Sequence, residues 1–290
     1  MVASAVIASG ILNGVVWGLI IIVISLGMCL ILGLMEIVNM AHGEFYMAGA
    51  VVSFYIVQWT GNWWLSLPIA FAVLAVMGLG WERGVLKHVE GDVIRTIIVT
   101  FGMSLIIMYT AHLNIVFGAT SYRIPNPVPF NIVLPWFTYS GFRTVSGIIA
   151  VAILVALLLF LFKTKFGLWI RAGRTDKEMT SAMGIDIGKV SVATFMIGSA
   201  IAGIAGALVV SVAAVNTYMG MEALVYAFLV VIIGGLGSLK GTVIAGFIVA
   251  MVDSLGGILL TPLWAKVILL SILIAILVFR PKGIYGVWGE

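Results

Sequence analysis

The chain has 290 residues, of which 63% are hydrophobic and only 9% are charged. Soluble globular domains carry about 25% charged and about 45–50% apolar residues, so this composition excludes a soluble enzyme, a disordered protein and a secreted disulfide scaffold. The single cysteine, Cys29, also excludes an internal disulfide and a metal cluster held by cysteines. We therefore predict an all-α polytopic membrane protein that forms one domain over residues 1–290.

Charge-free stretches of about 20 apolar residues mark the expected membrane crossings. The first covers residues 6–34, and because no basic segment precedes it, we interpret it as a retained helix and not as a signal peptide. The charge-free stretch 45–81 is too long for one crossing and is divided at Thr60-Gly61-Asn62, a turn signal. The remaining simple crossings are expected at 96–117, 144–162, 190–215 and 263–279.

Two stretches depart from this pattern. Residues 122–140 are apolar but rich in proline, which excludes a lipid-facing helix, so we expect an extended or short-helical segment outside the membrane. Residues 223–260 contain a glycine-rich bend that predicts two short, broken helices, which occur where they line a cavity or are buried in protein. About eight to ten transmembrane or broken helices follow from this division. The prolines are Pro125, Pro127, Pro129 and Pro135.

Small residues at regular spacing predict where helices pack closely. Gly198, Ala202 and Gly206 recur every four residues, and Gly14 and Gly18 have the same spacing on the first helix. Such faces let membrane helices approach without side chains between them.

The distribution of basic residues predicts the orientation. The positive-inside rule places loops rich in Lys and Arg in the cytoplasm. Basic residues are concentrated in the segments 83–95, 163–189 and 280–282, which share one side if nine helices cross the membrane. We therefore expect the N-terminus outside and the C-terminus in the cytoplasm. The basic residues left outside are Arg123, Arg143 and Lys266.

The longest cytoplasmic loop, residues 163–189, carries the signal of a short helix. Thr175 and Glu178 have the spacing of a capping box, and Gly184 is a typical helix stop. Adaptable apolar side chains on one face suit a helix-in-groove contact with a partner. The alternative is a helix that lies on the membrane surface and only connects two crossings. The expected docking helix covers about 176–183, and the docking residues are Asp176, Lys177, Glu178, Met179, Thr180, Ala182, Met183 and Gly184.

Polar residues near or within the crossings are candidates for a translocation path or its gate. Residues 36–44 hold a polar cluster, which either caps helix ends or forms a gate. A metal site is disfavoured, because it would need three or four converging ligands and no second cluster is evident in the sequence. Asp253 is isolated in an apolar run, where a charge is by default functional, unless it lies near a helix end and pairs with Lys240 or Lys266. The candidates are Glu36, Asn39, His42, Glu44, Tyr226, Gly234, Gly235, Gly237 and Asp253.

Several motifs, taken in order along the chain, resemble the LivH-type permeases of branched-chain amino-acid ABC transporters. Residues 33–50 (GLMEIVNMAHGEFYMAGA) resemble their early signature, residues 231–241 (VIIGGLGSLKG) their glycine-rich segment, and residues 279–286 (FRPKGIYG) their ending. Import permeases of this class also carry a cytoplasmic loop with an acid followed six positions later by glycine, as Glu178 and Gly184 are spaced here. Tyr226 departs from the family, in which a lysine is frequent at this place.

The resemblance implies a complete import machine in the bacterial inner membrane. The permease would pair with a second, related LivM-type subunit, two ATP-binding-cassette ATPases would hold ATP and magnesium, and a periplasmic binding protein would deliver the substrate. Membrane lipid would surround this chain, which would bind no cofactor and no nucleic acid. The sequence itself contains no G-x-x-x-x-G-K-[ST] phosphate loop, so ATP hydrolysis would belong to another chain. Branched-chain amino acids are the leading substrate, with urea, short amides and small organic acids also used in the family.

Two other function classes are weighed against this interpretation. An ion-gradient-driven secondary transporter would use Asp253 or Glu36 as its ion ligand and would transport without an ATPase. A membrane-embedded enzyme would need a convergent nucleophile, base or metal set, which the sequence does not suggest. We therefore predict a permease subunit that is not itself an enzyme.

Overall fold

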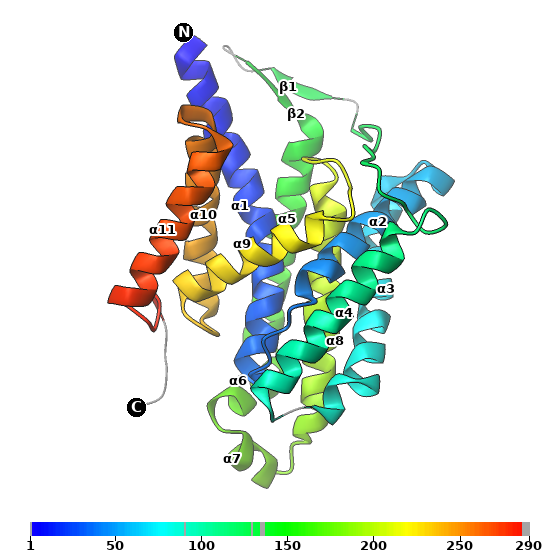
Figure 1. Cartoon of the computed structure of the whole chain (residues 1–290), viewed down its shortest axis with the longest axis vertical. Coiled ribbons are helices and arrows are strands. Elements are labelled where there is room, and N and C mark those ends of the chain that lie inside the picture. Colours follow the sequence, from blue (N-terminus) through cyan, green and yellow to red (C-terminus); the bar gives the residue numbers. More distant parts are fainter. Residues whose placement is uncertain (1, 90, 129, 134–136, 286–290) are drawn as a thin grey trace.

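The computed structural model describes residues 2–89, 91–128, 130–133 and 137–285, which form an elongated helical bundle (Figure 1). A two-stranded hairpin and the start of α1 lie at one end, here named the hairpin end, and α6 and α7 lie at the other, the α6–α7 end. The elements in chain order are α1 (Val2–Met35), α2 (His42–Thr60), α3 (Trp63–Gly84), η1 (Leu86–His88), α4 (Val93–His112), β1 (Asn131–Val133), β2 (Thr138–Ser140), α5 (Gly141–Lys163), α6 (Lys165–Thr175), α7 (Lys177–Ala182), α8 (Ile187–Val209), α9 (Met219–Gly234), α10 (Leu239–Leu259) and α11 (Pro262–Phe279).

Seven helices of the described part of the chain are long and apolar enough to cross a membrane: α1, α3, α4, α5, α8, α10 and α11. The prediction of a polytopic all-α protein is therefore confirmed. The other two expected crossings are also helices. However, α9 is shorter than a span, and α2 is not among the seven helices that are long and apolar enough to cross a membrane. The expectation that residues 223–260 form two short helices is wrong for the second one, since α10 has 21 residues.

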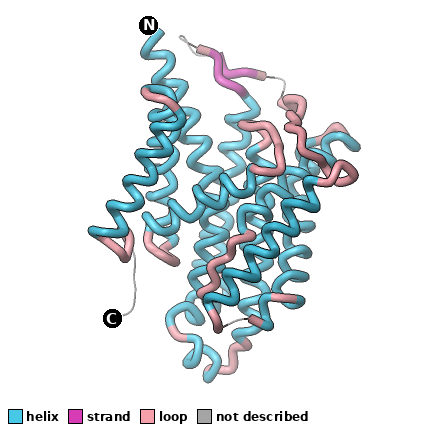
Figure 2. Tube along the Cα trace, in the orientation of Figure 1, coloured by secondary structure: helices cyan, strands magenta, loops and turns pink. Residues whose placement is uncertain are grey.

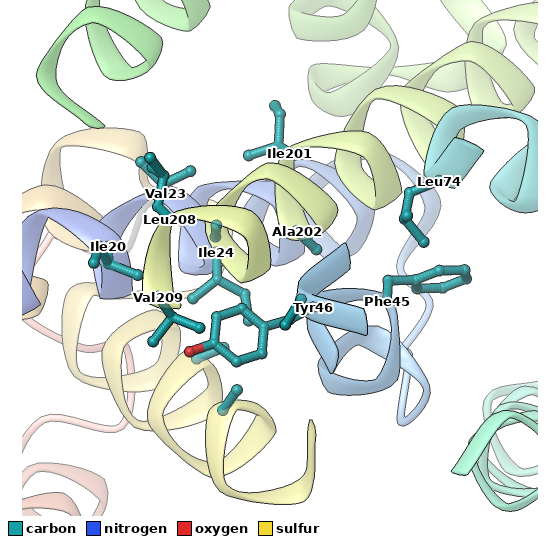
Figure 3. Packing of buried hydrophobic residues seen from close by; sticks show 14 of the residues in the cluster. Ile20, Val23, Ile24, Phe45, Tyr46, Leu74, Ile201, Ala202, Leu208 and Val209 are labelled. Carbon is teal, nitrogen blue, oxygen red and sulfur yellow. The ribbon is translucent and has the colours of Figure 1, made fainter. Parts of the chain in front are cut away.

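The core of the bundle is built by α1 and α8. In their most apolar windows 83% and 72% of the residues are buried, against 28% or less in the other five spans. Figure 3 shows side chains of α1 and α8, such as Ile24 and Leu208, packed around Tyr46 of α2. The five peripheral spans leave their outer faces free for lipid or for a partner subunit.

The predicted small-residue faces are confirmed as contact faces. A Cβ placed on Gly198 would lie 2.8 Å from the Ile31 side chain, and one on Gly206 would overlap the carbonyl oxygen of Tyr46. On the other side of α1, a Cβ on Gly14 would lie 3.0 Å from the sulfur of Met251 in α10. Glycine therefore lets α8 approach α1 and α2, and lets α1 approach α10, more closely than a larger residue would allow.

Most of the predicted turns are confirmed, with local reasons. Gly61 ends α2 with a φ of 68°, which glycine adopts without steric cost, and the side chain of Asn62 accepts a hydrogen bond from the amide of Trp64 at the start of α3. In the proline-rich segment 122–140, residues 131–133 and 138–140 form the β1–β2 hairpin, and Tyr122 forms an isolated bridge with Val215. Pro129, Pro135 and Gly286, which belong to expected segments, lie outside the described residues.

Candidate functional site

The helix α2 begins in the middle of the bundle and not at one of its ends. After α1 ends at Met35, the segment 36–41 runs back along the bundle as a loop (Figure 2). His42, the first residue of α2, has its Nε2 atom 2.9 Å from the carbonyl oxygen of Ile24. Ile24 lies eleven residues before the end of α1, which corresponds to about 16 Å at 1.5 Å per residue. The start of α2 is therefore about half the thickness of a 30 Å hydrocarbon layer away from the end of α1.

Hydrogen bonds to α4 hold the returning segment in place. The backbone amide of Met40 donates to Thr100 Oγ1 at 3.1 Å, and the same hydroxyl lies 3.2 Å from the carbonyl oxygen of Val38. Within the segment, the amide of Ala41 donates to Asn39 Oδ1 at 3.0 Å. The Thr100 hydroxyl thus accepts from an amide of non-helical backbone, and its one proton is shared between the carbonyls of Val38 and Ile97, both 3.2 Å away. Such side-chain partners are how irregular backbone is tolerated inside a membrane protein.

Glu44 is buried where α2, α4 and α9 meet. Its Oε1 atom accepts a hydrogen bond from Ser104 at 3.3 Å, and a Cβ placed on Gly220 would lie 2.5 Å from its Oε2 atom. The first turn of α2 favours a negative charge, because its free amides carry partial positive charge. Next to it, a Cβ on Gly43 would overlap the carbonyl oxygen of Gly220, so the starts of α2 and α9 touch backbone to backbone.

This contact, with Asn39, His42 and Glu44, is named the α2–α9 junction. The three side chains are 2% exposed or less, and in each one polar atom has no hydrogen-bond partner among the described residues: Asn39 Nδ2, His42 Nδ1 and Glu44 Oε2. An unpaired buried polar atom costs about 1–3 kcal/mol, so a purely structural joint is expected to satisfy such atoms. Three such atoms lie together beside the non-helical segment 36–41, so the junction stays a candidate for the gate.

Glu36 does not belong to this junction, although the sequence grouped it with the other three residues. It has a φ of 58°, the left-handed region in which a side chain is strained, and its carboxylate points to the α6–α7 end. There it lies 3.6 Å from the ammonium of Lys177, the first residue of α7. The ion pair joins the returning segment to the candidate docking helix.

A helix is present as α7 where the docking helix was expected, but its predicted cap is wrong. Asp176, not Thr175, is the cap: its carboxylate accepts from the amide of Met179 at 2.8 Å, whereas the Thr175 hydroxyl donates to the carbonyl of Arg171. The reason is that residues 165–175 form a helix of their own, α6, which the sequence did not reveal, so Thr175 is its last residue. Gly184 is the predicted stop, with a φ of 83°.

The apolar face of α7 is open. Met179 is 61% exposed and Met183 is 75% exposed, and Ala182 is exposed beside them, whereas Thr180 is buried against the bundle. Charges flank this face. At the start of α8 the amide and the ammonium of Lys189 lower the pKa of the Asp186 carboxyl below its usual value, so this acid is charged at neutral pH.

The glycine-rich bend lies at the α6–α7 end, away from the junction. Gly235 and Gly237 have φ values of 102° and 77°, and the guanidinium of Arg174 in α6 donates to the carbonyl of Gly237. The amide of Tyr285 donates to the carbonyl of Gly234 at 3.0 Å, so the chain ending also packs on the bend. These glycines therefore make a tight turn between α9 and α10 that contacts α6 through Arg174.

Asp253 is paired with neither lysine proposed from the sequence. Its Oδ1 atom accepts from the Tyr226 hydroxyl at 2.8 Å and its Oδ2 atom from the Trp17 indole at 3.1 Å. Lys266 lies instead 3.8 Å from Glu222. Glu222 stands inside the first turn of α9.

Sequence reasoning missed several of these residues. Thr100, Ser104 and Trp17 carry no local signal, since each acts on a partner 60 or more positions away. Among the described residues, no three His, Cys, Asp or Glu side chains are grouped so as to hold a metal ion.

Comparison with known proteins gives a consistent result. Residues 10–277 match the family model described as branched-chain amino acid transport system / permease component. The chain is 30% identical to the high-affinity branched-chain amino acid transport system permease protein LivH of Salmonella typhimurium, over 94% of both chains. It is 27% identical to the corresponding permease protein BraD of Pseudomonas aeruginosa, again over 94% of both. It is also 24% identical to the permease protein LivM of Escherichia coli, over 92% of this chain and 68% of that protein. No solved structure matches it.

Proposed function

Because this chain belongs to the branched-chain amino acid permease family, we propose that it is the membrane-spanning subunit of an ATP-driven importer for branched-chain amino acids. ATP would be hydrolysed by two partner ATPases that hold ATP and magnesium, and this chain would contribute no catalytic residue. A LivM-type protein is the expected second permease, which is supported by the likeness to LivM. A binding protein would deliver the amino acid to the hairpin end.

The proposed orientation of the chain in the membrane rests on the distribution of its basic residues. Basic residues of the loops 83–95 and 163–189 gather at the α6–α7 end, which would therefore lie in the cytoplasm of a bacterial inner membrane. The hairpin end, with the start of α1, would face outside. This arrangement presents α7 to soluble ATPases.

The observation that carries the proposal is the open apolar face of α7 together with its ionic link to the returning segment. Met179 and Met183 are exposed on a helix that is capped and stopped by its own residues, so the face is rigid and free to enter a groove of a partner. Lys177 on the same helix pairs with Glu36, and the segment 36–41 leads directly into α2.

The geometry supports a simple coupling mechanism. A partner that moves α7 displaces Glu36 through Lys177, and the displacement reaches the segment held by Thr100 on α4. A shift of this segment moves the start of α2 against α9, where Gly43 meets Gly220. The unpaired polar atoms of the α2–α9 junction then gain new partners as the path opens.

The experiment is purification of the tagged chain from its native host in mild detergent, followed by uptake assays in proteoliposomes. We expect a second permease and an ATPase to copurify, and leucine uptake to require ATP and the binding protein. Uptake of urea or short amides in place of leucine would change the substrate assignment. A chain that purifies alone and transports with an ion gradient would overturn the proposal.

Two substitutions test the docking role of α7 directly. Glu178→Lys and Gly184→Pro are expected to abolish ATP-dependent uptake while the protein still inserts, because the first reverses a charge on the docking helix and the second replaces a residue with positive φ. Normal ATPase recruitment and uptake in both variants would refute the docking assignment.

A further inference from the structure

A cavity of about 160 Å³ lies at the hairpin end, between the start of α5 and the loop that follows α8. Figure 1 shows this end of the bundle, where the β1–β2 hairpin leads into α5. The cavity is here named the arginine pocket, because two arginines line it and none of its lining residues is acidic. Its wall includes Arg123 and Asn126 from the segment before the hairpin, Phe142 and Arg143 of α5, and Val210 and Val212 after α8.

Arg143 is held at the wall by contacts with the two helices that build the core. Its guanidinium donates to Asn13 Oδ1 of α1 at 2.7 Å, and a second nitrogen lies 3.5 Å from the carbonyl oxygen of Val212, three residues after α8 ends. A guanidinium carries five N–H donors in a fixed fork, so these two contacts leave donors for a ligand. Arg143 therefore combines a fixed position with spare hydrogen-bonding capacity.

The segment that carries Arg123 is fixed as well. Tyr122 and Val215 exchange two backbone hydrogen bonds, of 2.8 and 2.9 Å, which hold this segment against the loop after α8. Further along it, Asn126 Oδ1 accepts from the amide of Val128 at 3.0 Å, which leaves the NH2 group of Asn126 as a donor at the pocket. The pocket thus has hydrogen-bond donors on three of its side chains.

The positive charge of the pocket is not balanced by an acid. Residues 93–175 and 187–221 contain neither Asp nor Glu, and neither arginine forms an ion pair in the described part of the chain. Ser140 gives α5 no side-chain cap, so the amides of its first turn add partial positive charge beside the pocket. Such a site favours an anion, and the forked guanidinium groups fit a carboxylate.

We propose that the arginine pocket receives an aspartate or glutamate side chain of the substrate-binding protein. The inference rests on the proposed function, in which that protein delivers the amino acid to the hairpin end, and it adds the residues that hold it there. The carboxylate lies between Arg123 and Arg143 and accepts from both guanidinium groups, with Asn126 as a further donor. Because Arg143 also holds Asn13 and Val212, the docked protein is joined to α1 and to the end of α8.

The pocket is not placed for the transported amino acid itself. None of its lining residues comes from α2, α4 or α9, the helices that meet at the α2–α9 junction. Its volume of about 160 Å³ is also below the range of about 300–1,000 Å³ that is typical of sites enclosing a whole small molecule. A space of this size suits one side chain that enters from the surface of a partner.

The direction of Arg143 disfavours a lipid headgroup as the ligand. Arg143 stands on the same face of α5 as Ser146 and Ala150, three and seven positions further on, and both of these residues are buried against the bundle. The exposed residues of α5, such as Ile148 and Val151, lie on its other face. A lipid that covers this outer face lies across the helix from Arg143, whereas a protein at the hairpin end meets the pocket directly.

The test measures how tightly the leucine-loaded binding protein of the same host binds the whole transporter in phosphatidylcholine nanodiscs. Arg123→Gln and Arg143→Gln each remove one charge, and each is expected to weaken binding by about tenfold or more. Added sodium chloride should weaken the wild-type complex, and it should weaken both variant complexes less, because one charge pair is already lost. The matched control is Lys266→Gln, which removes the same charge near the start of α11, outside the pocket, and should leave the affinity unchanged.

Further variants separate docking from a structural role. Arg143→Lys keeps the charge but loses the fork, so it should bind the protein more weakly than the wild type does, while thermal unfolding and copurification show that the transporter is assembled. Arg123→Glu is then combined with lysine substitutions of surface acids on the binding protein. One such combination should restore the affinity that Arg123→Glu alone loses, and a merely structural arginine would show no such rescue.

Separate outcomes overturn the two proposals. If the wild-type transporter neither binds a leucine-loaded protein nor takes up leucine, both the proposed function and the docking site fail. If it does both, and Arg123→Gln keeps the wild-type affinity and salt dependence, only the docking site is refuted. With that affinity unchanged, loss of free tritiated leucine from Arg123→Gln would assign the pocket to the amino acid, and loss of phosphatidylglycerol in native mass spectrometry would assign it to lipid.

Discussion

The ion pair between Glu36 and Lys177 gives the sharpest test of how movement at α7 reaches the membrane. The perturbations are Glu36→Lys, Lys177→Glu and the double exchange of both residues. The two charges lie 3.6 Å apart, and their side chains are 78% and 40% exposed. Exposed pairs contribute about 0–1 kcal/mol to stability, and a like-charge pair at this distance in water costs about 1 kcal/mol. Each single reversal should therefore lower the Tm by only a few degrees, about 2–4 °C per kcal/mol.

The effect on transport should be much larger than the effect on stability. In proteoliposomes, we expect each single reversal to reduce the leucine taken up per ATP hydrolysed by roughly fivefold or more, corresponding to a coupling free energy of about 1 kcal/mol or more. The double exchange restores an attractive pair and should recover most of the coupling. Lys189→Glu is the matched control, because Lys189 forms an exposed ion pair with Asp186 at the same end of the bundle. If the single variants couple normally, or if the exchange restores nothing, the pair has no part in coupling.

Three further predictions concern the α2–α9 junction, its support on α4, and Asp253. Gly43→Ala should destabilise the purified protein by about 1–3 kcal/mol in thermal unfolding, since its Cβ has no room against α9. Gly80→Ala inside α3, with nothing within 4 Å, should cause no loss and a gain of up to about 1 kcal/mol, because alanine favours a helix. Thr100→Val should cost about 1–3 kcal/mol and lower uptake, because it leaves a backbone amide of the returning segment unpaired. Thr194→Val, equally buried but bonded only within its own helix, should cost less, and equal unfolding temperatures for the two valine variants would contradict the argument. Asp253→Asn should reduce leucine uptake more than it reduces recovery of assembled transporter, and unchanged uptake would make Asp253 structural.

Much of the fold could be predicted from the sequence because its determinants are local. A charge-free apolar run must form a helix in lipid, where each backbone group needs a partner within the segment, and the run lengths set the positions of the spans. The same holds for the turn at Gly61 and for the stop at Gly184, where a positive φ favours glycine. The motif in residues 33–50 likewise indicated the family that the comparison confirmed.

The site could not be predicted in this way, because its contacts join distant parts of the chain. Glu36 and Glu44 belong to one motif, yet the left-handed turn at Glu36 sends one carboxylate to α7, while the return of the chain buries the other against α4 and α9. Asp253 finds its partner Trp17 236 positions away. A sequence pattern reports hydrophobic periodicity and the local conformational preference of the backbone. It therefore determined which residues are helical and which polar residues stand within apolar runs. Which of them meet was decided only by the packing of α2 and α9 into the bundle.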